Sequence, residues 1–170
     1  MTHSTKKLGM MFTVGAWLLG FLLMALAFSK ILDRQNNPNQ SVATLQSGEF
    51  QEVLLTRNRS GHYVFDGEIN HRKVTFLVDT GATTTAIPGS MQRSLGLEAG
   101  PPISVSTANG ITTAYLTRLD QLAIGAIEMY DVNASIIAGM GVDEVLLGMN
   151  VLKHFELVQR GDQLIIRRYK

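Results

Sequence analysis

The sequence contains no cysteine, which excludes disulfide bonds, a thiol nucleophile and zinc sites built from thiolates. Charge is also scarce, because 15 Lys and Arg against 14 Asp and Glu give a formal net charge of +1. No basic run is longer than two residues, so we expect no nucleic-acid partner bound through its phosphates. No His-x-x-x-His pair or acidic cluster with ligand spacing is present, so we expect neither a metal ion nor a cofactor.

Apolar residues are concentrated near the N-terminus, where residues 8–28 contain no charged side chain. As an α-helix this segment would be about 31 Å long, which is enough to cross a hydrocarbon core of about 30 Å. Two lysines precede the segment, and Lys30 and Arg34 follow it, so the basic residues do not set its orientation. The short tail, residues 1–7, with its free amine favours a cytoplasmic N-terminus. We therefore predict a single-pass anchor in the bacterial inner membrane, contacting the lipid bilayer, with the rest of the chain in the periplasm.

A cleaved signal peptide is the alternative interpretation of the same segment. The triplet Ala25-Leu26-Ala27 fits the small-x-small pattern before a cleavage site, and the lysine pair would form the basic n-region. The apolar run is longer than the usual ~7–15 residues of such a peptide, which favours a retained anchor. Both interpretations place the remainder of the chain outside the cytoplasm.

Residues 29–48 are expected to connect the anchor to a folded domain. Beyond residue 32 this segment is polar, rich in Asn, Gln and Ser, and has no hydrophobic period. Such composition is typical of a flexible tether. We therefore divide the chain into a cytoplasmic tail at 1–7, a transmembrane anchor at 8–28, a tether at 29–48 and a folded domain at 49–170.

The folded domain is predicted to be all-β, because short apolar segments alternate with turn residues throughout it. Asn109-Gly110, a strong hairpin signal, lies between two such segments. Short helices are expected only at 90–95 and 149–154. Strands are expected at 50–56, 62–69, 74–78, 103–108, 111–118, 119–124, 127–137, 145–147, 155–160 and 163–169. Strands of this length and spacing are typical of a sandwich or a small barrel with one core.

The segment with the most chemical information is 76–83, an apolar strand that ends in Asp79, Thr80 and Gly81. The strand would carry Asp79 to the rim of the core, and Gly81 would allow the backbone to turn sharply. The Thr80 hydroxyl can hydrogen-bond to neighbouring backbone groups. Because Asp, Thr and Gly are also common where an ordinary strand enters a turn, this triplet alone does not identify a catalytic loop.

Two later segments add to this signal. Residues 145–152 form a second apolar strand that ends in Gly148 and is followed by a short helix, and the Asn109-Gly110 hairpin lies between the two strands. In this order, the segments resemble the retropepsin-like aspartic proteases, in particular the membrane-anchored bacterial branch of that family. The resemblance covers residues 50–168.

The resemblance implies a single-lobe, closed all-β barrel with one or two short helices. It implies that Asp79 is the catalytic carboxylate in an active-site loop with Thr80, Gly81 and Ala82, and that Leu147 and Gly148 support this loop from behind. In this interpretation Asn109 and Gly110 belong to a flap that contacts the substrate. The implied reaction is hydrolysis of a peptide bond by a water molecule activated between two carboxylates that share one proton.

The second carboxylate has to come from another chain. The sequence contains no second Asp-Thr-Gly and no Asp-Ser-Gly. We therefore expect a symmetric homodimer in which each chain contributes its Asp79, acting on a protein or peptide substrate. Thr83 and Met149 stand where the retroviral enzymes carry an acidic residue and an arginine, so the ion pairs formed by those residues are not expected here.

A non-catalytic function on the same fold is the alternative. A membrane-tethered module of this kind could bind peptides, or assemble, by adding a strand to an exposed sheet edge. Such a module has no need of a carboxylate that faces its own copy. The intact Asp79-Thr80-Gly81-Ala82 loop therefore favours the enzyme.

Overall fold

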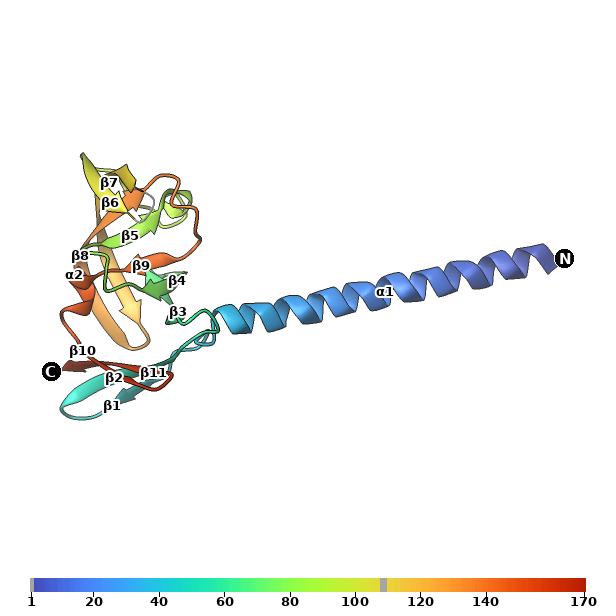
Figure 1. Cartoon of the computed structure of the whole chain (residues 1–170), viewed down its shortest axis with the longest axis horizontal. Coiled ribbons are helices and arrows are strands. Elements are labelled where there is room, and N and C mark those ends of the chain that lie inside the picture. The colour runs from blue at the N-terminus through green and yellow to red at the C-terminus, as the bar shows by residue number, and fades with distance from the viewer. Residues whose placement is uncertain (1, 108–109) are drawn as a thin grey trace. The chain divides into compact units, whose positions relative to one another are not determined.

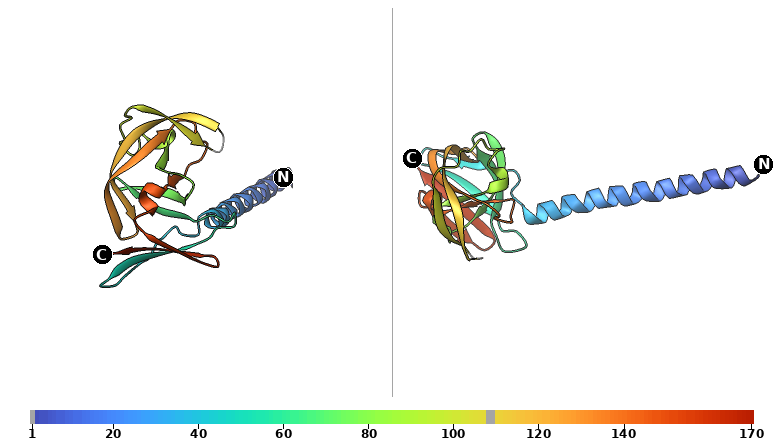
Figure 2. Two further views of the ribbon diagram at one scale, coloured as in Figure 1. Left: turned by 60° about the vertical axis from the view of Figure 1, so that its left-hand side comes forward. Right: turned by 90° about the horizontal axis from the view of Figure 1, so that it is seen from above.

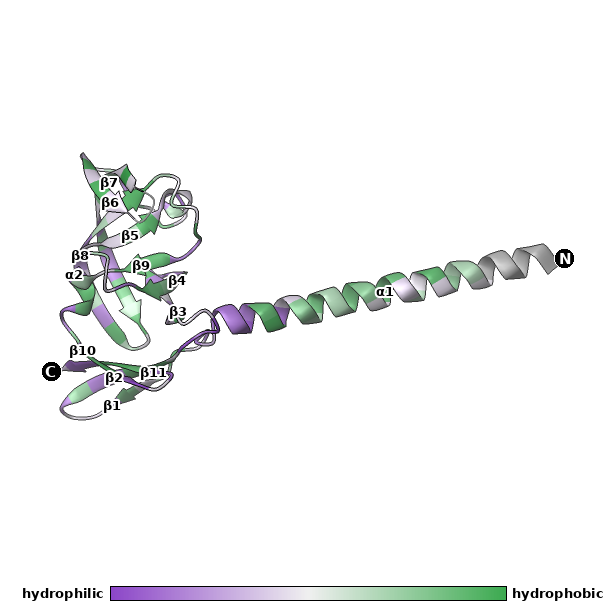
Figure 3. Cartoon of the chain, in the orientation of Figure 1, coloured by the Kyte–Doolittle hydropathy of each residue, from purple (hydrophilic) through white to green (hydrophobic). Residues whose placement is uncertain are grey.

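The computed structural model describes residues 2–107 and 110–170. The chain divides into two compact units, residues 1–35 and Asn36–Lys170. The first unit is formed by helix α1, Thr2–Asn36 (Figure 1). Its section Gly9–Asn36 is long and apolar enough to cross a membrane. The most apolar 18-residue stretch of this section is 0% buried. Figure 3 shows the apolar residues along this helix and hydrophilic residues at its C-terminal end.

The second unit is mostly β, as predicted. Its strands are β1 Thr44–Gln46, β2 Phe50–Thr56, β3 Val64–Ile69, β4 Arg72–Val78, β5 Thr85–Pro88, β6 Pro102–Thr107, β7 Gly110–Ile124, β8 Ile127–Ile137, β9 Val145–Leu147, β10 Glu156–Arg160 and β11 Gln163–Tyr169. A 3₁₀ turn, η1 Gly89–Met91, and a short helix, α2 Met149–Leu152, accompany them.

The larger sheet closes on itself. Its strand order is β3-β4-β9-β5-β8-β7-β6, and a further pairing between β3 and β7 joins its two sides. Figure 2 shows these strands curving around a common interior. Most neighbours are antiparallel, but β4 pairs in parallel with β9, and β5 pairs in parallel with β8. The strand spacing left a sandwich and a small barrel open, and the closed all-β barrel implied by the resemblance is confirmed.

The interior of the closed sheet is filled by large apolar side chains. Phe65 and Phe76, both fully buried, stack with ring centroids 5.3 Å apart on β3 and β4. Burying a side chain of this size contributes about 1.5–3 kcal/mol. Strand β4 is consequently a rigid support for the residues that follow its last residue, Val78.

A smaller sheet, with strand order β1-β2-β11-β10, covers one end of the core. Its inward side chains belong to the same core cluster, for example Val53 and Leu55 on β2 and Leu164 and Ile166 on β11. The two sheets thereby share one hydrophobic core.

Residues 29–48 differ from the expected tether. Helix α1 continues to Asn36, and the compact unit begins at that residue. Asn39 is 7% exposed; its amide donates to the carbonyls of Thr56 and Val64 and accepts the Thr56 N–H. The Thr44 hydroxyl accepts the N–H of Ala126. Polar side chains that suggest a tether in the sequence here satisfy backbone groups of neighbouring strands and turns.

Other differences concern element boundaries. Strand β5 was not expected, because four residues that end in Pro88 carry too little pattern. Strand β7 runs without a break through the boundary expected between residues 118 and 119. The helix expected at 90–95 is the shorter η1, and α2 ends at Leu152 instead of residue 154.

Candidate active site

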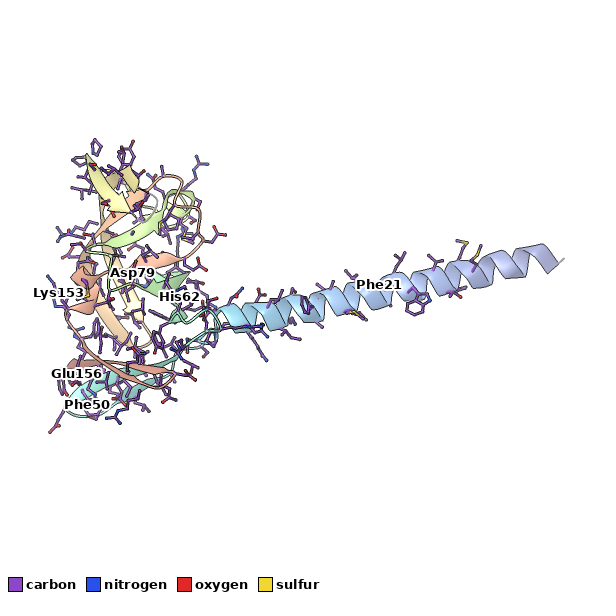
Figure 4. All side chains as sticks on the ribbon, viewed as in Figure 1. Phe21, Phe50, His62, Asp79, Lys153 and Glu156 are labelled. Atoms are coloured by element: carbon purple, nitrogen blue, oxygen red, sulfur yellow. The ribbon has the colours of Figure 1, made fainter. Side chains whose placement is uncertain are left out.

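Asp79 directly follows β4 and is held at its base by β9. The parallel pairing of these strands places Val78 beside Leu147, and the Asp79 N–H donates to the Leu147 carbonyl at 3.1 Å. Asp79 is partly buried, whereas Thr80 and Gly81 are exposed. Figure 4 labels Asp79 on the second unit of the chain. The strand pair thus places one carboxylate at the boundary between the core and the surface.

The backbone turns back on this carboxylate immediately. The Gly81 N–H donates to Asp79 Oδ1 at 2.8 Å, and the Ala82 N–H donates to the Asp79 carbonyl at 3.3 Å. A Cβ atom at position 81 would lie 3.2 Å from Asp79 Oδ1, so glycine allows this close approach. Within the described residues Oδ2 of Asp79 accepts no hydrogen bond. One carboxylate oxygen is therefore fixed and the other is available.

Gly148 lies against the back of the same loop. A Cβ atom there would lie 2.6 Å from the Thr84 carbonyl carbon and 2.9 Å from the Ala82 oxygen. The next residue, Met149, donates its N–H to the Ala82 carbonyl at 2.7 Å. The structure therefore brings Leu147 and Gly148 to the Asp79 loop, and the close contact explains why a glycine is needed.

Asn150 is a further residue of the site, for which the sequence suggested no role. Its Oδ1 accepts the N–H and the hydroxyl of Thr85, at 2.8 and 3.0 Å. Its Nδ2 donates to the Asn133 carbonyl at 2.7 Å, and its backbone N–H donates to the Thr83 carbonyl at 3.0 Å. These partners lie far from Asn150 in the sequence. The only local signal is an asparagine two residues after Gly148.

The hairpin between β6 and β7 contains the expected flap residues. Gly110 opens β7 with φ +110° and pairs with Thr107 across the hairpin. Asn109 lies outside the described residues. Ile111, next to Gly110, is 81% exposed. The base of the hairpin packs onto β5, β8 and β9 through a small apolar cluster of Ala86, Ala114 and Ile137 with Ile103, Val105, Met140 and Leu146.

Residues 79–84 and 147–150, which form and support the loop, carry no charged side chain apart from Asp79. Thr83 is exposed and Met149 is 37% exposed. Among the described residues, the ion pairs are formed by Arg57, Lys73, Arg118 and Arg167, none of which lies on this loop. In the same part of the chain no group of three or more His, Asp or Glu is arranged to hold a metal ion.

Residues 65–154 match the family model described as gag-polyprotein putative aspartyl protease. The matched segment contains the Asp79 loop, the hairpin and Gly148, and it is more than half of the chain. The chain belongs to this family. Aspartyl proteases act through paired carboxylates that share a proton.

Two curated relatives of this aspartyl protease family member are similar over much of its length. The "Uncharacterized protein in cobV 5'region" of Sinorhizobium sp is 28% identical over 167 residues, which cover 91% of this chain and 72% of the relative. The "Uncharacterized protein RP867" of Rickettsia prowazekii (strain Madrid E) is 30% identical over 127 residues, 72% of this chain. The aligned part is 54% of that relative, so the chain spans about half of its length.

The solved structures include a retropepsin-like aspartic protease from Rickettsia conorii. It superposes with a TM-score of 0.58 and 27% identity, over 76% of this chain and 95% of that chain. Together with the family match, this superposition confirms the retropepsin-like fold that was predicted from the order of the two apolar strands and the hairpin.

Proposed function

We propose that this protein is a membrane-anchored aspartic endopeptidase in which Asp79 of two identical chains supplies the two catalytic carboxylates. The observation that carries the proposal is the loop geometry of Asp79. Leu147 holds its backbone, Gly81 holds Oδ1, and Oδ2 is left available at a partly exposed position. An ordinary strand-to-turn residue would not need Gly148 and Asn150 to fix the loop from behind.

The chemistry follows from placing two such carboxylates together. Two negative charges about 3 Å apart cannot both persist, so the pair binds one proton. The ionised carboxylate takes a proton from a water molecule, which attacks the peptide carbonyl carbon, while the protonated carboxyl polarises the carbonyl oxygen. A proton is then delivered to the leaving amine, and the C–N bond breaks.

The second chain is required because each chain offers one Asp-Thr-Gly loop. The exposed face of this loop supports a two-fold contact, since Thr80, Gly81 and Thr83 are exposed and Met149 is 37% exposed. A two-fold axis beside Thr80 would bring the two Asp79 carboxylates together. Anchoring both chains in one membrane raises their effective concentration and favours the dimer.

The substrate is proposed to be an extended segment of a protein or peptide. The β6–β7 hairpin, with Asn109 and Gly110 at its tip, is proposed to close over it as a flap. The exposed Ile111 beside this tip favours apolar substrate side chains. The hairpin base is packed onto β9, the strand that also holds Asp79, so the flap and the carboxylate share one support.

The location proposed for the protein is the bacterial inner membrane. Helix section Gly9–Asn36 would cross the bilayer once, with the N-terminus in the cytoplasm and the protease domain in the periplasm. Cleavage after Ala27 by a signal peptidase is the competing outcome. A single measurement distinguishes them, because the mass of the protein isolated from whole cells shows whether residues 1–27 are retained.

The proposed activity is tested with the full chain reconstituted in bilayers and a diverse peptide pool, from acid to neutral pH. Asp79→Asn is expected to abolish cleavage while the protein stays folded, because the amide cannot act as the base. Asp120→Asn is the matched control, since Asp120 is exposed and its carboxylate makes no hydrogen bond or ion pair in the described residues. Cleavage that persists in Asp79→Asn would overturn the proposed mechanism. A folded, dimeric wild type that cleaves nothing would instead favour a peptide-binding module.

A further inference from the structure

The small sheet β1-β2-β11-β10 has apolar side chains on both of its faces. Successive strand residues point to opposite faces, and the pairs Leu54-Leu55 and Ile165-Ile166 are apolar at both positions. Leu55 and Ile166 are fully buried in the core. Their neighbours Leu54 and Ile165 lie directly opposite each other on the face turned away from the core. A solvated face of an antiparallel sheet normally carries polar residues at these positions.

We call this surface the outer face and define it by the side chains that share it. The strand registers place them in rows across the sheet, in which Val158 continues the row of Leu54 and Ile165 and in which Phe50 lies opposite Tyr169. None of them belongs to either core cluster. Leu45, Leu54 and Tyr169 are 62%, 44% and 58% exposed. The apolar members of the outer face are Leu45, Phe50, Leu54, Val158, Ile165 and Tyr169.

The central charges of the outer face, Arg167, Glu52 and Glu156, are paired with one another, and Arg160 lies at its edge opposite Gln163. Arg167 contacts Glu52 at 2.9 Å and Glu156 at 3.1 Å, and its guanidinium lies 4.8 Å from the centre of the Phe50 ring. The Tyr169 hydroxyl also donates to Glu156. Because its central charges are already compensated, the outer face does not call for a strongly charged partner. An apolar, electrically neutral environment fits it better.

The residues that follow the candidate membrane span are hydrogen-bonded within the second unit. The Asn36 carbonyl accepts the amide of Asn58, and the Asn37 amide donates to Asp66 at 2.7 Å. Asn39 is buried and its amide group makes three hydrogen bonds to Thr56 and Val64. Strand β1 begins eight residues after the last helical residue, Asn36, a distance of at most about 28 Å even for extended chain. The chain between α1 and β1 is therefore short, and its residues are bound to the second unit instead of forming a long flexible spacer.

We propose that the outer face rests in the interfacial layer of the bilayer that Gly9–Asn36 crosses. Leucine, isoleucine and valine would enter the boundary between headgroups and acyl chains, while Phe50 and Tyr169 have the amphipathic rings that favour this layer. A second attachment of this kind holds each domain in one orientation above the membrane. Two anchored chains then lose less rotational freedom when they pair. The proposal rests on the membrane span proposed above and is independent of the catalytic chemistry.

The natural absence of cysteine makes a site-specific test possible. Leu54→Cys carries an environment-sensitive fluorophore in the full chain, reconstituted in phosphatidylcholine nanodiscs with and without nitroxide-labelled lipid. Leu116→Cys is the matched control, because Leu116 is a strand leucine of the larger sheet with 42% exposure against 44% for Leu54. Leu19→Cys reports whether α1 itself is in the bilayer. We expect several-fold quenching by the nitroxide at positions 19 and 54 and little at position 116.

The other outcomes separate this inference from the proposed anchor. Quenching at position 19 without quenching at position 54 would overturn the inference and leave the anchor intact. Equal quenching at positions 54 and 116 would also overturn it, because no particular face would then contact lipid. Unquenched fluorophores at position 54, with disulfide cross-linking between two unlabelled Leu54→Cys chains on addition of a mild oxidant in a parallel sample, would assign the outer face to a second copy. No quenching at position 19 would refute the membrane span and this inference with it.

Discussion

Asn150 accepts two hydrogen bonds from Thr85 on a single oxygen, one from its N–H at 2.8 Å and one from its hydroxyl at 3.0 Å. Thr85 is fully buried, at the end of the loop that begins with Asp79. The Asn150 amide also donates to Asn133 on β8. The Asp79 loop is therefore fixed at both ends, by Leu147 at its start and by Asn150 at its close.

We expect Asn150→Ala to destabilise the protein by about 1–3 kcal/mol, because it leaves buried donors of Thr85 without an acceptor. We expect kcat/KM to fall by more than the loss of folded protein explains, since the loop that carries Asp79 loses its closing contact. Denaturant unfolding and kcat/KM of the full chain measure the two effects. Asn133→Ala is the matched control. Asn133 is exposed and contributes only its backbone carbonyl, so a change within about 0.5 kcal/mol is expected. Equal effects of both variants would contradict the role assigned to Asn150.

Gly148→Ala tests the close contact behind the loop. The alanine is compatible with the local backbone, where φ is −86° and ψ is 174°, so the variant isolates the contact of its Cβ with Thr84 and Ala82. We expect a loss of about 1–3 kcal/mol in stability from overpacking and a loss of about 10²-fold in kcat/KM from displacement of Asp79. Gly48→Ala is the control, because a Cβ there meets nothing within 4 Å. Full activity of Gly148→Ala would show that the loop adapts to the added atom.

Much of this site can be predicted from the sequence because its signals are local. The apolar residues before Asp79 define the strand that carries it, and Gly81 follows within the same turn. Gly148 is predictable for the same reason, since it ends a second apolar strand and precedes a short helix. In each case the residue and its structural cause lie within a few positions.

What was missed depends on contacts between distant segments. Asn150 acts through Thr85 and Asn133, and no local pattern pairs these residues. Strand β5 is held by β8 and β9 and not by any strand-forming pattern of its own. Asn39 belongs to a polar segment whose composition is typical of a linker. It is buried because its amide group forms hydrogen bonds with the backbone of Thr56 and Val64, which are distant in the sequence.

Asn39→Ala tests whether the segment after α1 is part of the fold. The variant removes the acceptor of the Thr56 N–H and the donor to the Thr56 and Val64 carbonyls. We expect a loss of about 1–3 kcal/mol, seen as a lower denaturant midpoint of the full chain. Gln40→Ala is the neighbouring control, since Gln40 is exposed. If Asn39→Ala unfolds at the wild-type midpoint, the segment behaves as a tether despite its hydrogen bonds.

The shared active site is tested by mixing chains. Wild type and Asp79→Asn are combined in equal amounts and reconstituted together at constant total protein. If both carboxylates are required and chains pair at random, about one quarter of the dimers carry two Asp79 residues. The initial rate is then expected to be about one quarter of that of wild type, because mixed dimers lack one carboxylate.

The same mixture distinguishes a dimeric site from one that each chain completes alone. A single-chain site would give about one half of the wild-type rate, since the variant would only dilute the active chains. Mixing wild type with Asp120→Asn controls for reconstitution, and this mixture is expected to keep the full rate. A series of mixing ratios sharpens the comparison, because the rate follows the square of the wild-type fraction for a shared site and the fraction itself for an independent one. A linear dependence, with the cuts still lost in pure Asp79→Asn, would keep Asp79 as the catalytic residue and refute the homodimeric mechanism.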